Sequence, residues 1–407
     1  MLGIDIGATK VASALVAPDG SIVRKSGRIV HANDGPDGVI GTLVQSVTAF
    51  LGGTSPIRPS AVGIAVAAQV DPRTGTVVHA PNLAWRDVPL ARKISEKLGG
   101  LPTVVLNDAR AATLAEWRFG AGRGTRDLFC LCLGTGVGGS AVIGGQLLEG
   151  GSHALGEVGH ITIVAGGRKC HCANRGCLEA YAGGWAIAER AQEAVRSDPE
   201  SGASLVARAG SVDAITAQTV LAARRAGDPL AERLVAETLR YLADGAVSVV
   251  NAFNPSLLVL SGGLVAGMPE IVRVLEAAVR TRCQPPAATA RVVLAALGED
   301  AALVGAAEAA RGGSGGMRYS SVPATCAPER TGRSPRRIDA PARGGRSDGS
   351  MPRSPAALPG RPRGPRAAAR SGESPSSCGS PGPARGTPAP EHPGERESPR
   401  RTNCRPR

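Results

Sequence analysis

A histidine and three cysteines in the middle of the chain have the types and the spacing of metal ligands. His160 precedes the run Cys170-His171-Cys172, and Cys177 follows after four intervening residues. Three thiolates and one imidazole fill the tetrahedral shell of a zinc ion and leave no position for substrate, which is typical of a structural site. His171 is the competing imidazole, but it lies between two cysteines and would have to turn back toward the same ion. We therefore predict Zn²⁺ bound by His160, Cys170, Cys172 and Cys177.

Two other interpretations of these cysteines are a disulfide and a set of unrelated thiols. Asp5 lies within what would be the apolar region of a secretory signal, so we expect a cytoplasmic protein in which disulfides are disfavoured. Unrelated thiols remain the alternative on spacing alone. Cys130, Cys132 and Cys283 lie in apolar contexts, which predicts positions in the core.

Three glycine-rich segments could bind phosphate groups, because small residues let backbone N–H groups approach phosphate oxygens closely. A single glycine turn is usually only a turn, but three of them, the first with an acid that could hold Mg²⁺ through water, favour a nucleotide site. None has the spacing of a P-loop or of the GxGxxG motif before a helix, which excludes those two classes. The candidate nucleotide-binding residues are Asp5, Gly7, Ala8, Thr9 and Lys10; Gly134, Thr135, Gly136 and Gly138 of the segment 134–139; and Gly262 and Gly263 after Ser261.

Asn107 and Asp108 end a buried strand immediately before a helix. Ligands of open α/β sheets collect at the carboxyl ends of strands, so a carboxylate at this point is well placed for chemistry. The alternative is a helix N-cap, and position alone favours the cap.

Strands and helices alternate along residues 1–310, which predicts an α/β fold. Residues 2–16 are expected to form a hairpin that turns at Gly7-Ala8-Thr9. Apolar spacing and alanine content predict helices over 36–51, 109–117 and 229–253. Short apolar runs predict buried strands at 61–66, 103–106, 127–133 and 257–260.

The basic character of the chain belongs to its C-terminal segment. The last 97 residues hold 19 arginines, 7 acidic residues and 17 of the 31 prolines, a net charge of +12, whereas residues 1–310 carry +1. Their isolated apolar residues cannot bury enough area to offset the ordering entropy, so we expect residues 311–407 to be disordered. Net basicity therefore indicates no specific nucleic-acid partner, and nonspecific binding by the arginines is the most that we expect. No apolar run approaches the roughly 20 residues of a membrane span.

Taken together, the motifs resemble those of the ROK family of sugar kinases, in the actin-like, hexokinase and Hsp70 ATPase superfamily. The resemblance runs from Leu2 to about Ala310, and GEVGH followed by CxC-x4-C-x-E is highly specific to that family. The segments that carry it are DIGATK (5–10), Asn82-Leu83, NDA (107–109), LGTGVGG (133–139), GEVGH (156–160), CHCANRGCLE (170–179) and SGG (261–263).

The resemblance implies two actin-like (ribonuclease-H-like) domains with the active cleft between them. Their expected limits are 1–108, completed by a helix near 300–310, and 109–298 with the zinc loop. Asp108 matches the catalytic base of the family. The implied sugar ligands are Asn82, Asn107, Asp108, Glu157, His160 and Glu179. The implied partners are a hexose, ATP with Mg²⁺, a structural Zn²⁺ that holds the sugar-binding loop, and further copies of the chain in a dimer or tetramer.

The implied reaction is the ATP-dependent phosphorylation of a hexose at its 6-hydroxyl, with glucose as the first candidate. N-acetylglucosamine or N-acetylmannosamine is the alternative, because the sugar ligands are largely shared. Regulators of the family carry a helix-turn-helix before the first phosphate loop, which here begins at residue 5, so we expect a kinase. Ala8 and Ala67-Ala68 depart from the family's glycine and Pro-Gly, which leaves the rate and the sugar preference open. Arg110 replaces a common asparagine after the base.

Overall fold

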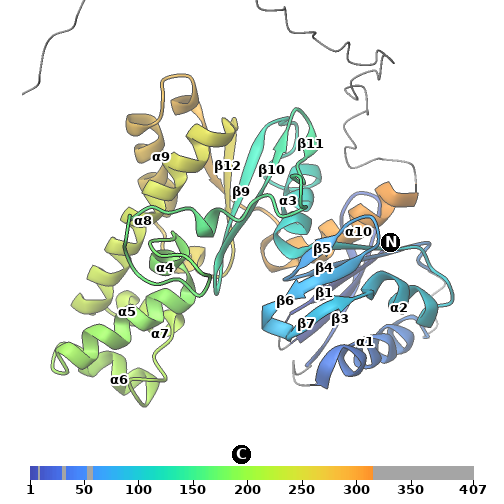
Figure 1. Cartoon of the computed structure of the whole chain (residues 1–407), viewed down its shortest axis with the longest axis horizontal. Helices are drawn as coiled ribbons and strands as arrows, with labels where there is room; N and C mark the ends of the chain where they lie inside the picture. The colour runs from blue at the N-terminus through green and yellow to red at the C-terminus, as the bar shows by residue number, and fades with distance from the viewer. Residues whose placement is uncertain (8–9, 30–33, 53–57, 315–407) are drawn as a thin grey trace, which may run out of the picture. The chain divides into compact units, whose positions relative to one another are not determined.

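The computed structural model describes residues 1–7, 10–29, 34–52 and 58–314, which form the predicted α/β fold (Figure 1). Within these ranges, no helix combines the length and the apolar character needed to cross a membrane. Ala8 and Thr9 lie outside the described residues, as does the C-terminal segment from residue 315 onward. Residues 311–314 were expected to be disordered, but they belong to the last helix, α10 (Ala301–Ser314).

Two five-stranded sheets repeat one topology. The first has the strand order β3-β2-β1-β4-β8 and the second β11-β10-β9-β12-β13. In each sheet, three strands form an antiparallel meander. A fourth strand pairs in parallel with the first strand of that meander, and a fifth strand pairs in parallel with the fourth. The strands of the first sheet are β1 (Leu2–Ile6), β2 (Lys10–Val16), β3 (Ile22–Ile29), β4 (Val62–Val66) and β8 (Thr103–Asn107), and those of the second are β9 (Leu128–Leu133), β10 (Val137–Ile143), β11 (Gln146–Leu147), β12 (Leu257–Ser261) and β13 (Arg291–Leu294).

The repeat places two glycine turns in equivalent positions. Gly7 donates its backbone N–H to Lys10 O at 2.9 Å in the β1–β2 turn, and Gly134 donates to Gly136 O at 3.0 Å in the β9–β10 turn. In each sheet, therefore, a glycine at the carboxyl end of the first strand closes the connection to the second strand with a backbone hydrogen bond.

A third, smaller sheet follows the first sheet's fourth strand. It has the order β5-β6-β7 and consists of β5 (Gln69–Asp71), β6 (Thr76–Ala80) and β7 (Trp85–Val88). Between β6 and β7, the 3-10 helix Pro81–Leu83 carries Asn82. This sheet was not predicted from the sequence, because its strands are too short to have a period.

Side chains along the strands of the first sheet point alternately to its two faces, and different helices cover each face. Leu2, Ile4 and Ile6 point into a core with the helices α1 (Gly35–Leu51) and α2 (Leu90–Lys97). The opposite face takes α10, whose backbone lies so close that a Cβ on Gly63 would come within 1.7 Å of Ala306 O. Glycine at this position is therefore what lets the C-terminal helix lie directly on the first sheet.

The second sheet also has two covered faces. Phe129, Leu131 and Leu133 point into the largest core, against a group of helices that surrounds the long helix α8 (Pro229–Phe253) (Figure 1). Leu128 and Cys130 point the other way, toward Leu114 of α3 (Asp108–Arg118) and Ala309 of α10. The remaining helices of this half are α4 (Glu179–Ala182), α5 (Gly184–Ser197), α6 (Ala203–Ala209), α7 (Ala217–Arg225) and α9 (Ile271–Arg282).

A buried carboxylate fastens the segment after β13 to α3. Glu116 is fully buried, and its two oxygens accept the backbone N–H groups of Ala121 at 2.8 Å, Ala296 at 3.0 Å and Leu297 at 2.8 Å. A buried carboxylate is tolerated where several donors satisfy it, so Glu116 fixes the path by which the chain enters α10.

Most elements that were predicted from apolar periodicity occur within a few residues of the expected ranges, including the hairpin at 2–16 and the helices at 36–51, 109–117 and 229–253. The segment 137–139 is an exception, because it was expected to continue a glycine loop and instead begins β10. Gly138 pairs with Cys132 and Gly139 with Leu131, so the ladder continues through both glycines. The loop itself is therefore limited to Gly134-Thr135-Gly136.

Candidate active site

A cleft of about 460 Å³ contains all six side chains that the sequence marked as sugar ligands. They come from distant parts of the chain: the small sheet, the β8–α3 junction, the segment after β11 and the start of α4. The six are Asn82, Asn107, Asp108, Glu157, His160 and Glu179. Gly134 to Gly138 line the same cleft. Sugar-type ligands and a phosphate-type loop therefore share one space.

The cleft has further polar lining that the sequence did not reveal. Gln69 and His79 of the small sheet face it, and so does the thiol-bearing residue Cys132. Cys132 was expected in the core. It is half-buried, packs against the core cluster that contains Cys130, and also lines the cleft near the end of β9. Cys130, two residues earlier on the same side of the strand, is fully buried as expected.

Asp108 lies at the first position of α3, and its neighbour caps the helix. Asn107 Oδ1 accepts the backbone N–H of Arg110 at 3.2 Å, so Asn107 is the N-cap. Asp108 Oδ1 accepts the N–H of Ala109 at 2.8 Å. Burial raises the pKa of Asp108, and these hydrogen bonds only partly oppose it. A desolvated carboxylate with a raised pKa is suited to accept a proton from a substrate hydroxyl.

Asp5 is a second half-buried carboxylate whose pKa is raised. Burial, followed by the nearby charge of Asp108, raises its pKa to about 6, although Lys10 and Lys25 oppose the shift. Asp5, Gly7 and Lys10 line their own hollow of about 220 Å³ with Lys25 and Asp300. Burial raises the pKa of both Asp5 and Asp108, and a divalent cation would stabilise the ionised form of each, so these carboxylates fit Mg²⁺.

The segment that carries Glu157 and His160 is pressed against β10. Gly156 has a φ of +105°, and a Cβ there would lie 1.9 Å from Gly139 O, so only glycine fits. Glu157 then precedes the 3-10 helix Val158–His160. Burial raises the pKa of Glu157. Its Oε2 lies 3.9 Å from Nε2 of His160, so both side chains face the same part of the cleft.

The predicted metal ligands lie together. One atom from each of His160, Cys170, Cys172 and Cys177 lies within 4.8 Å of the others. Cys170 Sγ is 3.7 Å from His160 Nδ1, and Cys172 Sγ is 3.7 Å from Cys177 Sγ. Tetrahedral zinc with Zn–S bonds of about 2.3 Å requires edges of about 3.8 Å, so the four residues fit zinc.

The chemistry of these thiols also fits a bound cation. Burial, and then the neighbouring thiols, raise the pKa of Cys177 to about 12. Three thiolates in this space therefore require a cation to stabilise them. His171 points away from the cluster and stacks on the indole ring of Trp185, with ring centroids 3.8 Å apart.

Glu179 is held by two donors at the start of α4. Its Oε2 accepts the backbone N–H of Val137 at 2.8 Å, and its Oε1 accepts the indole N–H of Trp185 at 3.1 Å. The carboxylate therefore joins the phosphate-type turn to the zinc loop, and both oxygens keep lone pairs for a sugar hydroxyl.

A second hollow, of about 500 Å³, shares Gly134 and Thr135 with the cleft. We call it the base slot. Its other lining residues are Gly184, Trp185, Ala188, Thr216, Ala217, Gln218, Gly263 and Leu264. Gly263 is the only residue of the third glycine segment that lines it, since Gly262 is turned against Leu133 O. No feature of the sequence marked Trp185 or residues 216–218, which have the residue types of an ordinary helix start.

Comparison with known proteins agrees with this geometry. The family model described as "ROK family" matches residues 1–312. A glucokinase of Streptomyces coelicolor is 34% identical over 316 residues, which cover 76% of this chain and 97% of that protein. A solved ROK family glucokinase from Streptomyces griseus, in complex with glucose and AMPPNP, is 36% identical with a TM-score of 0.67 and covers 76% of this chain and 99% of its own. A ROK family transcriptional regulator, a homolog of the E. coli MLC protein, is 26% identical with a TM-score of 0.68 and covers 78% of this chain and 79% of its own.

Proposed function

Because the chain belongs to the ROK family, we propose that it is a sugar kinase that transfers the γ-phosphoryl group of ATP to the 6-hydroxyl of a hexose, with glucose as the first substrate. The observation that carries this proposal is the cleft in which a half-buried carboxylate, Asp108, lies among amide, carboxylate and imidazole side chains. The likeness to a glucokinase structure with glucose and AMPPNP supports both substrates.

In this proposal Asp108 is the general base. It accepts the proton of the sugar hydroxyl while the hydroxyl oxygen forms its bond to the γ-phosphorus and the bond to the leaving ADP breaks. Asn82, Asn107, Glu157 and Glu179 offer paired donors and acceptors, which suit the hydroxyl groups of a hexose. Their task is to hold the reacting oxygen beside Asp108, because phosphoryl transfer depends mainly on positioning and on charge neutralisation.

The nucleotide is assigned to the base slot and to the glycine turns. The slot has a large aromatic wall in Trp185 and opens onto the turn at Gly134-Thr135-Gly136, so a base in the slot would direct its phosphates toward the cleft. Asp5 would hold Mg²⁺, and Lys10 would lie beside the phosphates. Mg²⁺ supplies neutralisation of the charge that develops on the phosphate oxygens.

Zinc is assigned a structural role through His160. Its Nδ1 faces Cys170 and its Nε2 faces Glu157. If Nδ1 is a metal ligand, Nε2 must carry the proton, so the ring presents a fixed donor to the sugar. One imidazole can thus serve both the metal cluster and the sugar site, which reconciles the two roles expected for His160.

An N-acetylhexosamine is the second candidate substrate, and one observation favours it. A side hollow of about 100 Å³ adjoins Asp108 and Glu157 and is lined by Gln69, Arg110 and His153. The buried Nε of Arg110 has no hydrogen-bond partner among the described residues. The carbonyl oxygen of an acetamido group could accept this donor, whereas glucose has no substituent of that length.

A screen of ADP release tests the proposal. The full chain is assayed with ATP and Mg²⁺ against glucose, mannose, N-acetylglucosamine and N-acetylmannosamine, with Asp108→Asn as the control for contaminating kinases. We expect the highest kcat/KM with glucose. Turnover with an N-acetylhexosamine alone would select the second candidate, and sugar binding without ADP release for any sugar would contradict the kinase assignment and favour a sugar-responsive regulator.

A further inference from the structure

Trp185 is the one side chain in the described parts of the chain that contacts the sugar ligand Glu179, stacks on the zinc loop and lines the base slot. Its indole N–H donates to Glu179 Oε1 at 3.1 Å. Its ring stacks on His171, between the ligand residues Cys170 and Cys172, with an angle of 16° between the planes. Its backbone N–H donates to Thr135 O at 3.1 Å in the glycine turn.

We propose that Trp185 is a positioning residue that couples the zinc loop and the base slot to the sugar ligand Glu179. This inference rests on the proposed function, since it assigns a sugar to the cleft and a nucleotide to the slot. Trp185 need not touch the sugar. It acts by fixing the carboxylate of Glu179, which has one donor from Val137 at the start of β10 and one from the indole ring.

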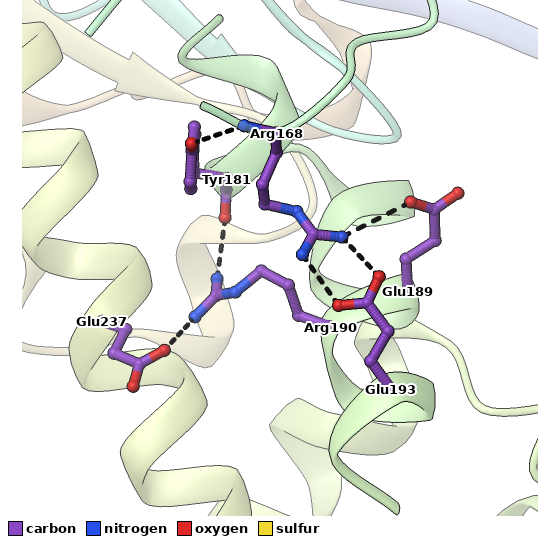
Figure 2. A network of polar contacts seen from close by, with 6 residues as sticks. All are labelled: Arg168, Tyr181, Glu189, Arg190, Glu193 and Glu237. Carbon is purple, nitrogen blue, oxygen red and sulfur yellow. Dashed lines mark hydrogen bonds and ion pairs between the residues drawn. The ribbon is translucent and has the colours of Figure 1, made fainter. Parts of the chain in front are cut away.

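A network of hydrogen bonds and ion pairs connects the segment before the first cysteine to α5, the helix that carries Trp185. Figure 2 shows Arg168, in the segment before the first cysteine, bound by both of its terminal nitrogens to Glu193 of α5 at 2.7 and 2.8 Å. The backbone N–H of Arg168 donates to the hydroxyl of Tyr181 at 2.8 Å. The buried Arg190 of α5 donates to Tyr181 O at 2.8 Å and to Glu237 of α8 at 2.6 Å.

This network fixes one end of the zinc loop to α5 and fixes α5 to α8. The part of the loop that carries His171 lies beyond that anchor, and its contact with α5 is through the Trp185 ring and the weak 3.7 Å approach of His171 to Glu189. A shift of Cys170 or Cys172 can therefore reach Glu179 by two routes, along the chain from Cys177 and through the contact between His171 and the indole ring.

The same geometry predicts that the two substrates favour each other's binding. A base that packs against Trp185 in the slot restricts the ring and so holds the indole N–H on Glu179, which prepares the sugar site. By linkage, a sugar bound to Glu179 must improve nucleotide binding by the same factor.

Two substitutions separate the parts of this role. Trp185→Phe keeps an aromatic wall for the slot and for His171 but removes the N–H donor. We expect it to weaken glucose binding about tenfold, the scale of one hydrogen bond to a charged group, and to change binding of a non-hydrolysable ATP analogue less than about threefold. Trp185→Ala also removes the wall and should weaken both. Trp117→Phe is the matched control, because its indole N–H donates to Thr125 O at 2.9 Å outside the site.

Calorimetric titration of the full chain with each ligand, alone and with the other at saturation, measures these effects and the coupling factor. The coupling factor is the readout that a merely structural role would not move. Intrinsic fluorescence adds whether the emission that responds to each change comes from Trp185. Glucose, and separately removal of zinc by a chelator, should change the emission of wild type and of Trp117→Phe, and Trp185→Phe should lose both changes. The fluorescence of the folded variant also shows whether Trp185→Phe retains its core, since Trp85 is buried in the first half.

Wild-type glucose affinity and an unchanged coupling factor in Trp185→Phe would overturn the inference, as would chelator and glucose responses that persist without Trp185. Failure of the proposed function looks different. In that case the wild type itself binds neither glucose nor the ATP analogue, and the inference falls with it.

Discussion

Asp5→Asn should make the protein more stable while abolishing its proposed catalysis, and the gain should depend on pH. Burial raises the pKa of Asp5 from its ordinary value of 3.8 to about 6. Below about pH 4 the carboxyl group is protonated in the folded and the unfolded chain, so ionisation costs nothing. As the pH rises through 6, the folded protein must hold a charge that the unfolded chain accommodates more easily, and stability is lost.

The size of the effect follows from that pKa. One pKa unit corresponds to about 1.4 kcal/mol, so the ionised carboxylate costs the folded state roughly 3 kcal/mol above pH 7. At pH 4.5 the same linkage gives only about 1 kcal/mol. Asparagine keeps the shape of the side chain and carries no charge. The difference in unfolding free energy between Asp5→Asn and wild type should therefore be about three times larger at pH 7.5 than at pH 4.5.

Urea denaturation of both proteins at the two pH values measures this difference, and taking the difference cancels the titration of unaltered groups. Asp19→Asn is the control of opposite sign. The hydroxyl and backbone N–H of Ser21 lower the pKa of Asp19, so its replacement should reduce stability at pH 7.5. An equal gain for Asp5→Asn at both pH values, or no gain at pH 7.5, would refute the claim that a buried charge destabilises this site.

Three further substitutions test other parts of the structure. Asp108→Asn should lower kcat by at least about 100-fold without lowering the melting temperature, because Asn107 caps α3 and burial disfavours the charge that is removed; turnover close to wild type would leave Asp108 without a catalytic role. Cys172→Ser should yield protein without zinc and with a strongly raised KM for sugar, while nucleotide binding suffers less; metal analysis and separate titrations measure this, and zinc-free wild type with full activity would contradict the ligand set. Glu116→Gln should cost about 3 kcal/mol in urea denaturation, because an amide cannot accept all three backbone N–H groups; a loss below 1 kcal/mol would mean that water replaces them.

The sequence predicted the fold class and the ROK family membership, and both are confirmed. The fold class followed from the apolar runs of buried strands such as 62–66 and the periodicity of long amphipathic helices such as 229–253. The family followed from its motifs, some of whose glycines lie where two backbone segments are in close contact. The six sugar-type ligands were found by their match to family motifs, and the structure brings them into one cleft. Their catalytic and binding roles stay predictions.

Contacts that depend on tertiary packing could not be predicted from the sequence. The base slot is formed by residues near 134, 185, 217 and 263, none of which has an unusual type or spacing. Cys132 looked like a core residue because its strand alternates regularly up to the edge of the cleft. The sequence left a catalytic carboxylate and a helix N-cap as alternatives at the β8–α3 junction, and the hydrogen bond from Arg110 N to Asn107 Oδ1 shows that Asn107 is the cap.

The position of α10 has a consequence for how the protein is made. Synthesis proceeds from the N-terminus, so β1 and β4 are translated long before residues 301–314 exist. The face of the first sheet that contacts Ala306 through Gly63 therefore lacks its α10 partner, and has only α3 to pack against, while the whole second sheet is being synthesised. The first sheet is the earliest part of the described chain to leave the ribosome. The packing of one of its faces is completed only when α10, the last described helix, has been synthesised.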